Sequence, residues 1–138
     1  MNDCLFCRIV ARQSPADVAG SLLGAGADVV GMNCGRGPDR AIAIIREMRA
    51  ATDAPLIAYP NAGLPNAFGQ YDESPEETAA LVAEFARSGF LNIVGGCCGT
   101  TPAHIKAVAE AVKGLRPRQW HALPPALRLS GMEAASFM

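Results

Sequence analysis

The stretch GFLNIVGGCCGTTPAHI, residues 89–105, decides the fold. Within it, the apolar run Leu91 to Gly95 is typical of a buried strand, and Thr101-Pro102 is typical of the start of a helix. Gly89 is typical of the end of a preceding helix. The stretch therefore predicts a helix, a strand, a loop with two adjacent cysteines, and a further helix.

The same order of elements occurs twice more toward the N-terminus. Apolar runs at 28–32 and 55–59 predict two further strands. The other helices are predicted to begin at three cap signals, which are Ser14-Pro15, Gly37-Pro38 and Ser74-Pro75. Apolar strands that alternate with helices indicate a parallel sheet with helical crossovers. We therefore predict an α/β fold.

The ends of the three predicted strands align as ADVVGMNC (27–34), APLIAYPN (54–61) and LNIVGGCC (91–98). Polar or thiol residues then fall in register at the ends of the runs, namely at Cys34, Asn61 and Cys98. In parallel α/β folds the carboxyl ends of the strands converge on one face, where ligands bind. The alignment therefore predicts a site at this end of the sheet.

Cys34, Cys97 and Cys98 suit a zinc ion, because Zn²⁺ is tetrahedral and accepts thiolate ligands. Glycines next to the cysteine pair would let the backbone turn sharply and approach a metal; they are Gly95, Gly96 and Gly99. The alternative is that the cysteines are buried as small hydrophobic residues, a common role of the free thiol. The spacing matches no standard zinc-finger pattern, so spacing alone leaves both interpretations open.

The composition excludes several classes of protein. The 138 residues suffice for one domain, half of them are hydrophobic, and 12 basic and 13 acidic residues give a net charge of −1. This balance excludes a disordered chain and makes nucleic acid or a lipid surface a poor partner. No apolar run has the length of a membrane helix, and no signal pattern begins the chain. With five cysteines, an odd number, we expect a cytoplasmic chain that uses thiols for metal binding or catalysis.

Three motifs resemble the homocysteine S-methyltransferase domain, and most closely that of the cobalamin-dependent methionine synthases. They are MNCGRGPD (32–39), YPNAGLPNAFGQYDESPEE (59–77) and GFLNIVGGCCGTTPAHI (89–105). The resemblance extends from about residue 18 to residue 133, where RLSGME (128–133) is similar to the exit toward a folate domain. It implies a TIM-type (βα)₈ barrel.

The resemblance also implies an activity and a site. The activity is zinc-dependent methyl transfer to the thiol of homocysteine, which gives methionine, with methylcobalamin on another domain as donor. The zinc ligands would be Cys34, Cys97 and Cys98, and Asn61 in the PNAG motif would occupy the fourth zinc position before substrate arrives. The resemblance implies no catalytic residue beyond this zinc site. It assigns Asn61 to substrate binding.

A complete barrel of this type needs about 250 residues. The resemblance therefore implies strands six to eight only, with a partial homocysteine-binding barrel at 19–114 and an extended tail at 115–138. Partners would be homocysteine, a complementary barrel half, and folate or cobalamin domains; open sheet edges would also favour self-association. The alternative is that the chain is not an enzyme but a non-catalytic zinc-binding half-barrel that acts only in an assembly.

Residues 1–18 (MNDCLFCRIVARQSPADV) resemble the start of histidine-triad nucleotide hydrolases, in which a Cys-x-x-Cys pair binds zinc. The pair here would be Cys4 and Cys7, either a second metal site or unpaired thiols. The triad itself is absent, because the chain has only His104 and His121, so nucleotide hydrolysis is not expected. We expect His104 to cap the last helix or face solvent.

Overall fold

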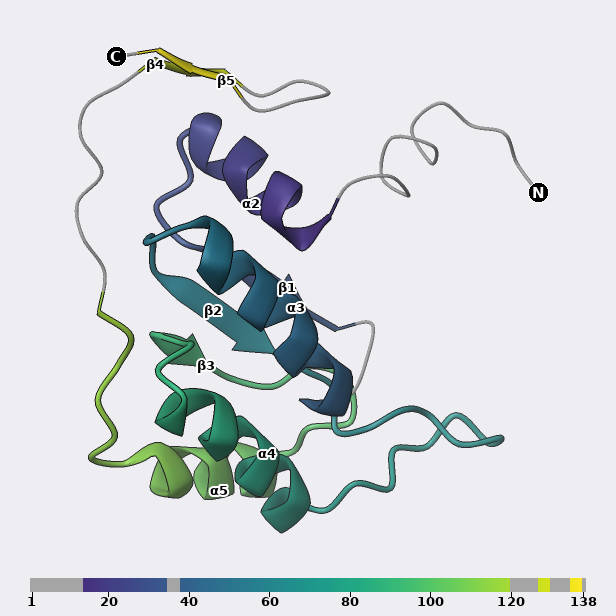
Figure 1. Cartoon of the computed structure of the whole chain (residues 1–138). Coiled ribbons are helices and arrows are strands. Elements are labelled where there is room, and N and C mark those ends of the chain that lie inside the picture. Colours follow the sequence, from purple (N-terminus) through teal and green to yellow (C-terminus); the bar gives the residue numbers. More distant parts are fainter. Residues whose placement is uncertain (1–13, 35–37, 120–126, 130–134, 138) are drawn as a thin grey trace.

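The computed structural model describes residues 14–34, 38–119, 127–129 and 135–137. Helices and strands alternate along most of this length (Figure 1). The elements are α2 (Pro15–Gly24), β1 (Val30–Asn33), α3 (Pro38–Ala51), β2 (Leu56–Tyr59), α4 (Pro75–Arg87), β3 (Ile93–Val94), α5 (Pro102–Val112), β4 (Leu127–Leu129) and β5 (Ala135–Phe137). The predicted α/β fold is confirmed, and its three βα units have the arrangement of part of a (βα)₈ barrel.

The first three strands form one parallel sheet with β2 at its centre. Val30 of β1 pairs with Leu56 of β2, and Ile57 of β2 pairs with Ile93 of β3. The parallel order predicted from the alternation of strands and helices is therefore confirmed. Because all three strands run the same way, their carboxyl ends lie at one edge of the sheet.

The strands are shorter than the apolar runs that predict them. β3 covers two residues where the sequence predicts five, because the side chain of Asn92 replaces part of the strand. Its Oδ1 accepts a hydrogen bond from the Leu56 N–H at 3.0 Å, and its own N–H donates to the Leu56 carbonyl at 2.9 Å. β1 begins at Val30 and not at the predicted residue 28, because its pairing with β2 begins with Val30 opposite Leu56.

Two helices begin with the capping signals that predict them. In α2 the Ser14 hydroxyl accepts from the Asp17 N–H at 3.2 Å, and the Asp17 carboxylate accepts from the Ser14 N–H at 3.1 Å. Ser74 and Glu77 make the same reciprocal pair at the start of α4, at 3.3 and 2.8 Å. Each pair satisfies two backbone donors that a helix end leaves without partners.

The helices pack in the order α2, α3, α4, α5 along one side of the molecule (Figure 1). Ile45 of α3, Leu56 of β2 and Phe85 of α4 are fully buried in the core that results. A smaller cluster joins α4 to α5 through Val82 and Val108. Burial of each such side chain stabilises the fold by roughly 1.5–3 kcal/mol, which holds the sheet against the helices.

The other face of the sheet is less covered. Ile57 and Ile93 pair across β2 and β3 and therefore point to the same face. Ile57 is half-buried and Ile93 is 41% exposed, whereas Leu56 on the opposite face is fully buried. The sheet thus has one face packed against helices and one partly exposed apolar face.

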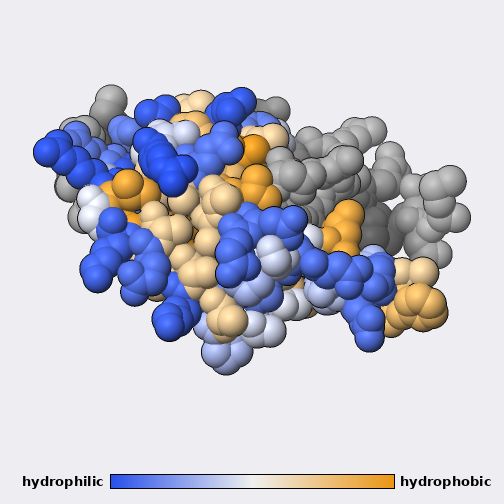
Figure 2. All heavy atoms as spheres, turned by 90° about the horizontal axis from the view of Figure 1, so that it is seen from below, coloured by the Kyte–Doolittle hydropathy of each residue, from blue (hydrophilic) through white to orange (hydrophobic). Residues whose placement is uncertain are grey.

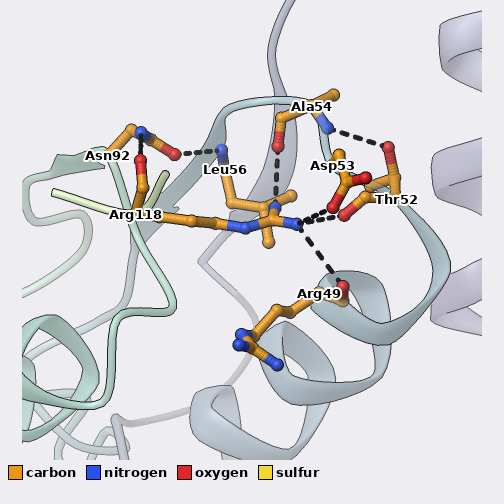
Figure 3. A network of polar contacts seen from close by, with 7 residues as sticks. All are labelled: Arg49, Thr52, Asp53, Ala54, Leu56, Asn92 and Arg118. Atoms are coloured by element: carbon orange, nitrogen blue, oxygen red, sulfur yellow. Dashed lines mark hydrogen bonds and ion pairs between the residues drawn. The ribbon is translucent and has the colours of Figure 1, made fainter. Parts of the chain in front are cut away.

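The segment after α5 is anchored to the sheet by Arg118. Its backbone N–H donates to the Leu91 carbonyl at 2.9 Å, and its buried guanidinium donates to the carbonyls of Arg49, Thr52 and Ala54. These carbonyls lie at the end of α3 and in the loop that leads to β2 (Figure 3). Further along, β4 and β5 pair antiparallel, a feature that the expected extended tail at 115–138 does not include.

None of the helices in the described part of the chain is long and apolar enough to cross a membrane.

Candidate metal centre

Three thiols meet at the carboxyl end of the parallel sheet. Cys34 directly follows β1, and Cys97 and Cys98 lie in the loop after β3. The Sγ atoms of Cys34 and Cys98 are 3.5 Å apart, those of Cys97 and Cys98 are 3.9 Å apart, and all three lie within 4.8 Å of one another. The three cysteines that the sequence marks as candidate zinc ligands are therefore close together in the structure.

The spacing of the sulfur atoms suits a tetrahedral metal. Ligands about 2.3 Å from a tetrahedral Zn²⁺ lie roughly 3.8 Å from one another, which is close to the Sγ–Sγ separations of 3.5 and 3.9 Å. Three thiolates also form a soft ligand set of the kind that selects zinc among the common divalent ions. The cluster can hold a metal ion and leaves a tetrahedral ion one further ligand position.

Backbone hydrogen bonds continue the sheet up to the cysteines. The Cys34 N–H donates to the Tyr59 carbonyl at 2.9 Å, which extends the pairing of β1 with β2. On the other side of β2, the Cys97 N–H donates to the Pro60 carbonyl at 2.9 Å. Two of the three thiols are therefore held by the backbone of the central strand and its extension.

Unusual backbone conformations place the side chains. Cys34 has a φ of 58°, in the left-handed region, which costs a residue with a Cβ atom roughly 1–2 kcal/mol. Gly99 has a φ of +80°, and a Cβ atom there would lie 2.3 Å from Cγ of Tyr71. At Gly96 a Cβ atom would lie 2.4 Å from Cγ2 of Thr100. Glycine is required at both of these positions because of the close approach of side chains.

Asn61 lies in the same cluster. Its side chain is buried, and its Oδ1 accepts a hydrogen bond from the Cys98 N–H at 3.3 Å. The next residue, Ala62, donates its N–H to the Cys98 carbonyl at 2.9 Å. The loops after β2 and β3 are thus joined through the residue that the sequence alignment places in register with the cysteines.

Tyr71 is a neighbour of the thiols that sequence reasoning missed. Burial raises the pKa of its phenol above the ordinary 10.0, and so do its hydrogen bond to Cys98 and the negative charge of the nearby thiolates. Hydrogen bonds with Cys34 and Cys97 raise the pKa of the Cys98 thiol above 9.0, against the opposing effect of Tyr71. The Tyr71 side chain also packs against Gly99, the residue after Cys98, where an added Cβ atom would lie 2.3 Å from Cγ of Tyr71. No strand-end pattern marks this residue, which returns to the site from a long loop.

His104 caps α5 and is buried. Its Nδ1 accepts from the Thr101 N–H at 3.2 Å, and its Nε2 lies 2.9 Å from the Glu73 carbonyl oxygen. The expected capping role is confirmed, and the alternative that His104 faces solvent is wrong, because the ring links α5 to Glu73 in the loop before α4. Its neighbours are backbone groups and the Thr101 hydroxyl, which leaves it a structural role.

Other residues singled out by the sequence lie outside the described part of the chain. They are Cys4, Cys7 and His121. Both interpretations of the cysteine pair, a second metal site or unpaired thiols, therefore stay untested.

Fold and site together define the class of protein: a parallel α/β domain with a three-thiol cluster at the carboxyl ends of its strands. The model of the homocysteine S-methyltransferase family matches residues 6–112. Since this match covers well over half of the 138 residues, the chain belongs to the homocysteine S-methyltransferase family. The match begins at residue 6, within the segment 1–18. It does not test the likeness of that segment to histidine-triad proteins, which stays a prediction.

Proposed function

We propose that this chain binds Zn²⁺ through Cys34, Cys97 and Cys98 and takes part in methyl transfer to the thiol of homocysteine. The observation that carries the proposal is the cluster of three sulfur atoms within 4.8 Å of one another, in a chain of this family. A zinc ion bound there would act as a Lewis acid that keeps a substrate thiol deprotonated near neutral pH.

The residues around the thiols contribute position and charge. Three thiolates carry more negative charge than neutral ligands would, so a sulfur held beside them stays electron-rich and nucleophilic. The left-handed backbone at Cys34 and the hydrogen bond from Cys97 to Pro60 fix two of the sulfur-bearing residues on the sheet. Such a preorganised site loses little free energy to reordering when a ligand arrives.

We assign Asn61 to substrate binding and to the fourth ligand position before substrate arrives. Its buried Oδ1, next to the Cys98 backbone, supports this role, because an amide oxygen is a neutral ligand that a thiolate displaces readily. An Asn61→Ala variant that still bound one zinc ion, more weakly than the wild type, and had an altered affinity for homocysteine would support both roles. Unchanged binding of both would contradict them.

We propose methylcobalamin, carried on another domain, as the methyl donor. The support is the resemblance of the motifs at 32–39, 59–77 and 89–105 to the cobalamin-dependent methionine synthases. Folate or cobalamin domains would then be partners. We also propose a cytoplasmic location, because a metal site built from three thiols suits a reducing compartment.

The alternative is a non-catalytic zinc-binding half-barrel that acts only in an assembly. The observation that favours it is the partly exposed sheet face with Ile93, together with the unpaired outer edges of β1 and β3 among the described residues. Complementary βα units would cover this face and pair with these edges, and self-association is the other way to cover them.

Two measurements test the proposal. Zinc content should be one ion per chain in the wild type and close to zero in a variant with Ser at positions 34, 97 and 98. Methionine formation from homocysteine and methylcobalamin should be slow for the chain alone and faster with a complementary barrel half, because orientation of substrate contributes several powers of ten in rate. Full activity of the monomer would exclude the half-barrel alternative, and activity without zinc would contradict the proposed role of the metal.

A further inference from the structure

The backbone of the cysteine pair is held on one side by the segment that follows β2. The Cys97 N–H donates to the Pro60 carbonyl at 2.9 Å. The Cys98 N–H donates to Oδ1 of Asn61 at 3.3 Å, and the Cys98 carbonyl accepts from the Ala62 N–H at 2.9 Å. Beyond Ala62 the chain forms the loop that extends to the right in Figure 2, hydrophilic along much of its length and hydrophobic at its tip. The start of this loop thus leaves the Cys97 carbonyl as the remaining backbone group of the pair.

Thr100 satisfies the Cys97 carbonyl with two donors. Its N–H donates to this oxygen at 3.2 Å, and its hydroxyl donates to the same oxygen at 2.7 Å. The bond from the N–H closes a β-turn over residues 97–100, with Cys98 and Gly99 at its centre. The φ of +80° at Gly99 is that of the third residue of a type II turn, a position that favours glycine. The two thiols therefore lie at the first and second positions of a tight turn.

The Thr100 side chain is packed in the orientation that its hydrogen bond needs. A Cβ atom added at Gly96 would lie 2.4 Å from Cγ2 and 2.8 Å from Oγ1 of Thr100. The side chain therefore lies directly against the bare backbone of Gly96, the residue before the cysteine pair. Because a β-branched side chain has few χ1 rotamers, this contact helps to keep the hydroxyl directed at the Cys97 carbonyl.

The turn is what allows two adjacent cysteines to serve one ion. Successive side chains of an extended strand point to opposite faces, so neighbouring thiols converge only where the chain leaves the strand conformation. In the turn the Sγ atoms of Cys97 and Cys98 lie 3.9 Å apart. A contact that fixes the turn therefore also fixes the separation of two proposed metal ligands.

We propose that Thr100 is a positioning residue of the metal site, whose hydroxyl holds the turn in which the thiols of Cys97 and Cys98 face one ion. The inference rests on the proposed metal site and deepens it. Without the hydroxyl, the Cys97 carbonyl keeps the Thr100 N–H as a donor, so the turn still forms but is held less firmly. Groups that orient a ligand residue without touching the metal typically contribute 10- to 100-fold to metal affinity.

Thr100→Val is the test, because valine has nearly the shape of threonine and lacks the hydroxyl. Thr101→Val is the matched control, since the Thr101 hydroxyl lies 2.8 Å from Nδ1 of His104 and serves the start of α5. Thr100→Ser keeps the hydroxyl and removes the methyl group. Competition with a chelator measures zinc affinity, and the absorption bands of thiolate-bound Co²⁺, added in place of zinc, report on the sulfur ligands.

We expect Thr100→Val to bind one zinc ion with 10- to 100-fold lower affinity and to shift the Co²⁺ bands. Thr101→Val should bind zinc like the wild type, even where it lowers the stability of the metal-free fold. Thr100→Ser should recover most of the affinity that Thr100→Val loses, because the hydrogen bond to the Cys97 carbonyl is restored.

Three outcomes overturn the inference and differ from one another. If Thr100→Val binds zinc as tightly as the wild type and its Co²⁺ spectrum is unchanged, the hydroxyl has no role and the metal site itself stands. If Thr101→Val or Thr100→Ser loses as much affinity as Thr100→Val, the loss comes from the stability or packing of this region and not from the hydroxyl of Thr100. If the wild type binds no metal, the proposed function fails and this inference fails with it.

Discussion

The Sγ atoms of Cys34 and Cys98 lie 3.5 Å apart although the residues are 64 positions apart in the chain. Two helical crossovers separate them, and the parallel sheet brings them together because its strands all end at the same edge. The separation is typical of two thiolates on one tetrahedral ion and too long for a disulfide bond. The first prediction follows from this pair.

Replacement of Cys34, Cys97 or Cys98 with Ser should lower zinc affinity by at least 100-fold in each case, because a hydroxyl is a poor ligand compared with a thiolate. Competition with a chromogenic chelator at constant pH measures the change. Cys4→Ser and Cys7→Ser are the matched controls, and we expect them to keep one tightly bound zinc. Loss of that zinc in the controls, with full binding in Cys98→Ser, would contradict the assignment.

Zinc binding should release protons and strengthen as the pH rises. The pKa of Cys98 is raised above 9.0 in the metal-free site, so this thiol is protonated near neutral pH and must lose its proton to bind a metal. Calorimetry in buffers of different ionisation enthalpy measures the number of protons released. An affinity that does not change between pH 6 and pH 8 would be incompatible with thiolate ligands.

The same raised pKa has the opposite effect on the metal-free fold. A thiol with a higher pKa in the folded chain than in the unfolded chain stabilises the fold below the unfolded value, and this contribution is lost as the pH rises through the folded value. The free energy of unfolding of the metal-free chain should therefore fall as the pH rises above 9.0. Urea titrations at several pH values measure it. Cys98→Ser should show a smaller fall, and an equal fall would assign the effect to other groups.

Arg118→Ala should destabilise the fold by about 3 kcal/mol, because it leaves carbonyls that the guanidinium satisfies without a partner. The buried Arg118 donates to Ala54 at 2.7 Å and also to Thr52, and it lies 3.7 Å from the Asp53 carboxylate. Burial lowers the pKa of Arg118. The midpoint of urea unfolding measures the loss.

Arg116→Ala, at an exposed position two residues earlier, should change stability by less than about 0.5 kcal/mol. Equal effects of the two variants would show that the network in Figure 3 contributes nothing.

The course of the chain through the sheet is predictable from local signals. Apolar runs indicate buried strands, and Ser-Pro pairs followed by an acidic residue mark the starts of α2 and α4. The cysteines are predictable as a group because the carboxyl ends of parallel strands meet. These inferences need only the period of the pattern and the direction of the strands.

Arg118, Tyr71 and the burial of His104 are not predictable in this way, because each depends on a contact between distant segments. Arg118 lies in a stretch without periodicity and reaches carbonyls 64 to 69 residues earlier in the chain. Tyr71 packs against Gly99 only because the loop between β2 and α4 turns back at Asn66. A polar side chain in a loop carries no local sign of the segment against which it will pack.

Gly99→Ala should damage the metal site more than its backbone conformation alone explains. Gly99 and Gly114 have nearly equal φ angles, +80° and +77°, so an added Cβ atom costs each roughly 1–2 kcal/mol of backbone strain. At Gly114 nothing lies within 4 Å of the added atom, whereas at Gly99 it would lie 2.3 Å from Cγ of Tyr71. The alanine at 99 must push the Tyr71 side chain away or shift the backbone next to Cys98, and either movement displaces a proposed zinc ligand. We expect Gly99→Ala to lower zinc affinity by at least 10-fold, and Gly114→Ala to lower the unfolding midpoint slightly with unchanged zinc affinity. Chelator competition and urea unfolding on both variants measure the two effects. Equal zinc affinities in Gly99→Ala and Gly114→Ala would mean that the contact between Tyr71 and Gly99 does not support the site.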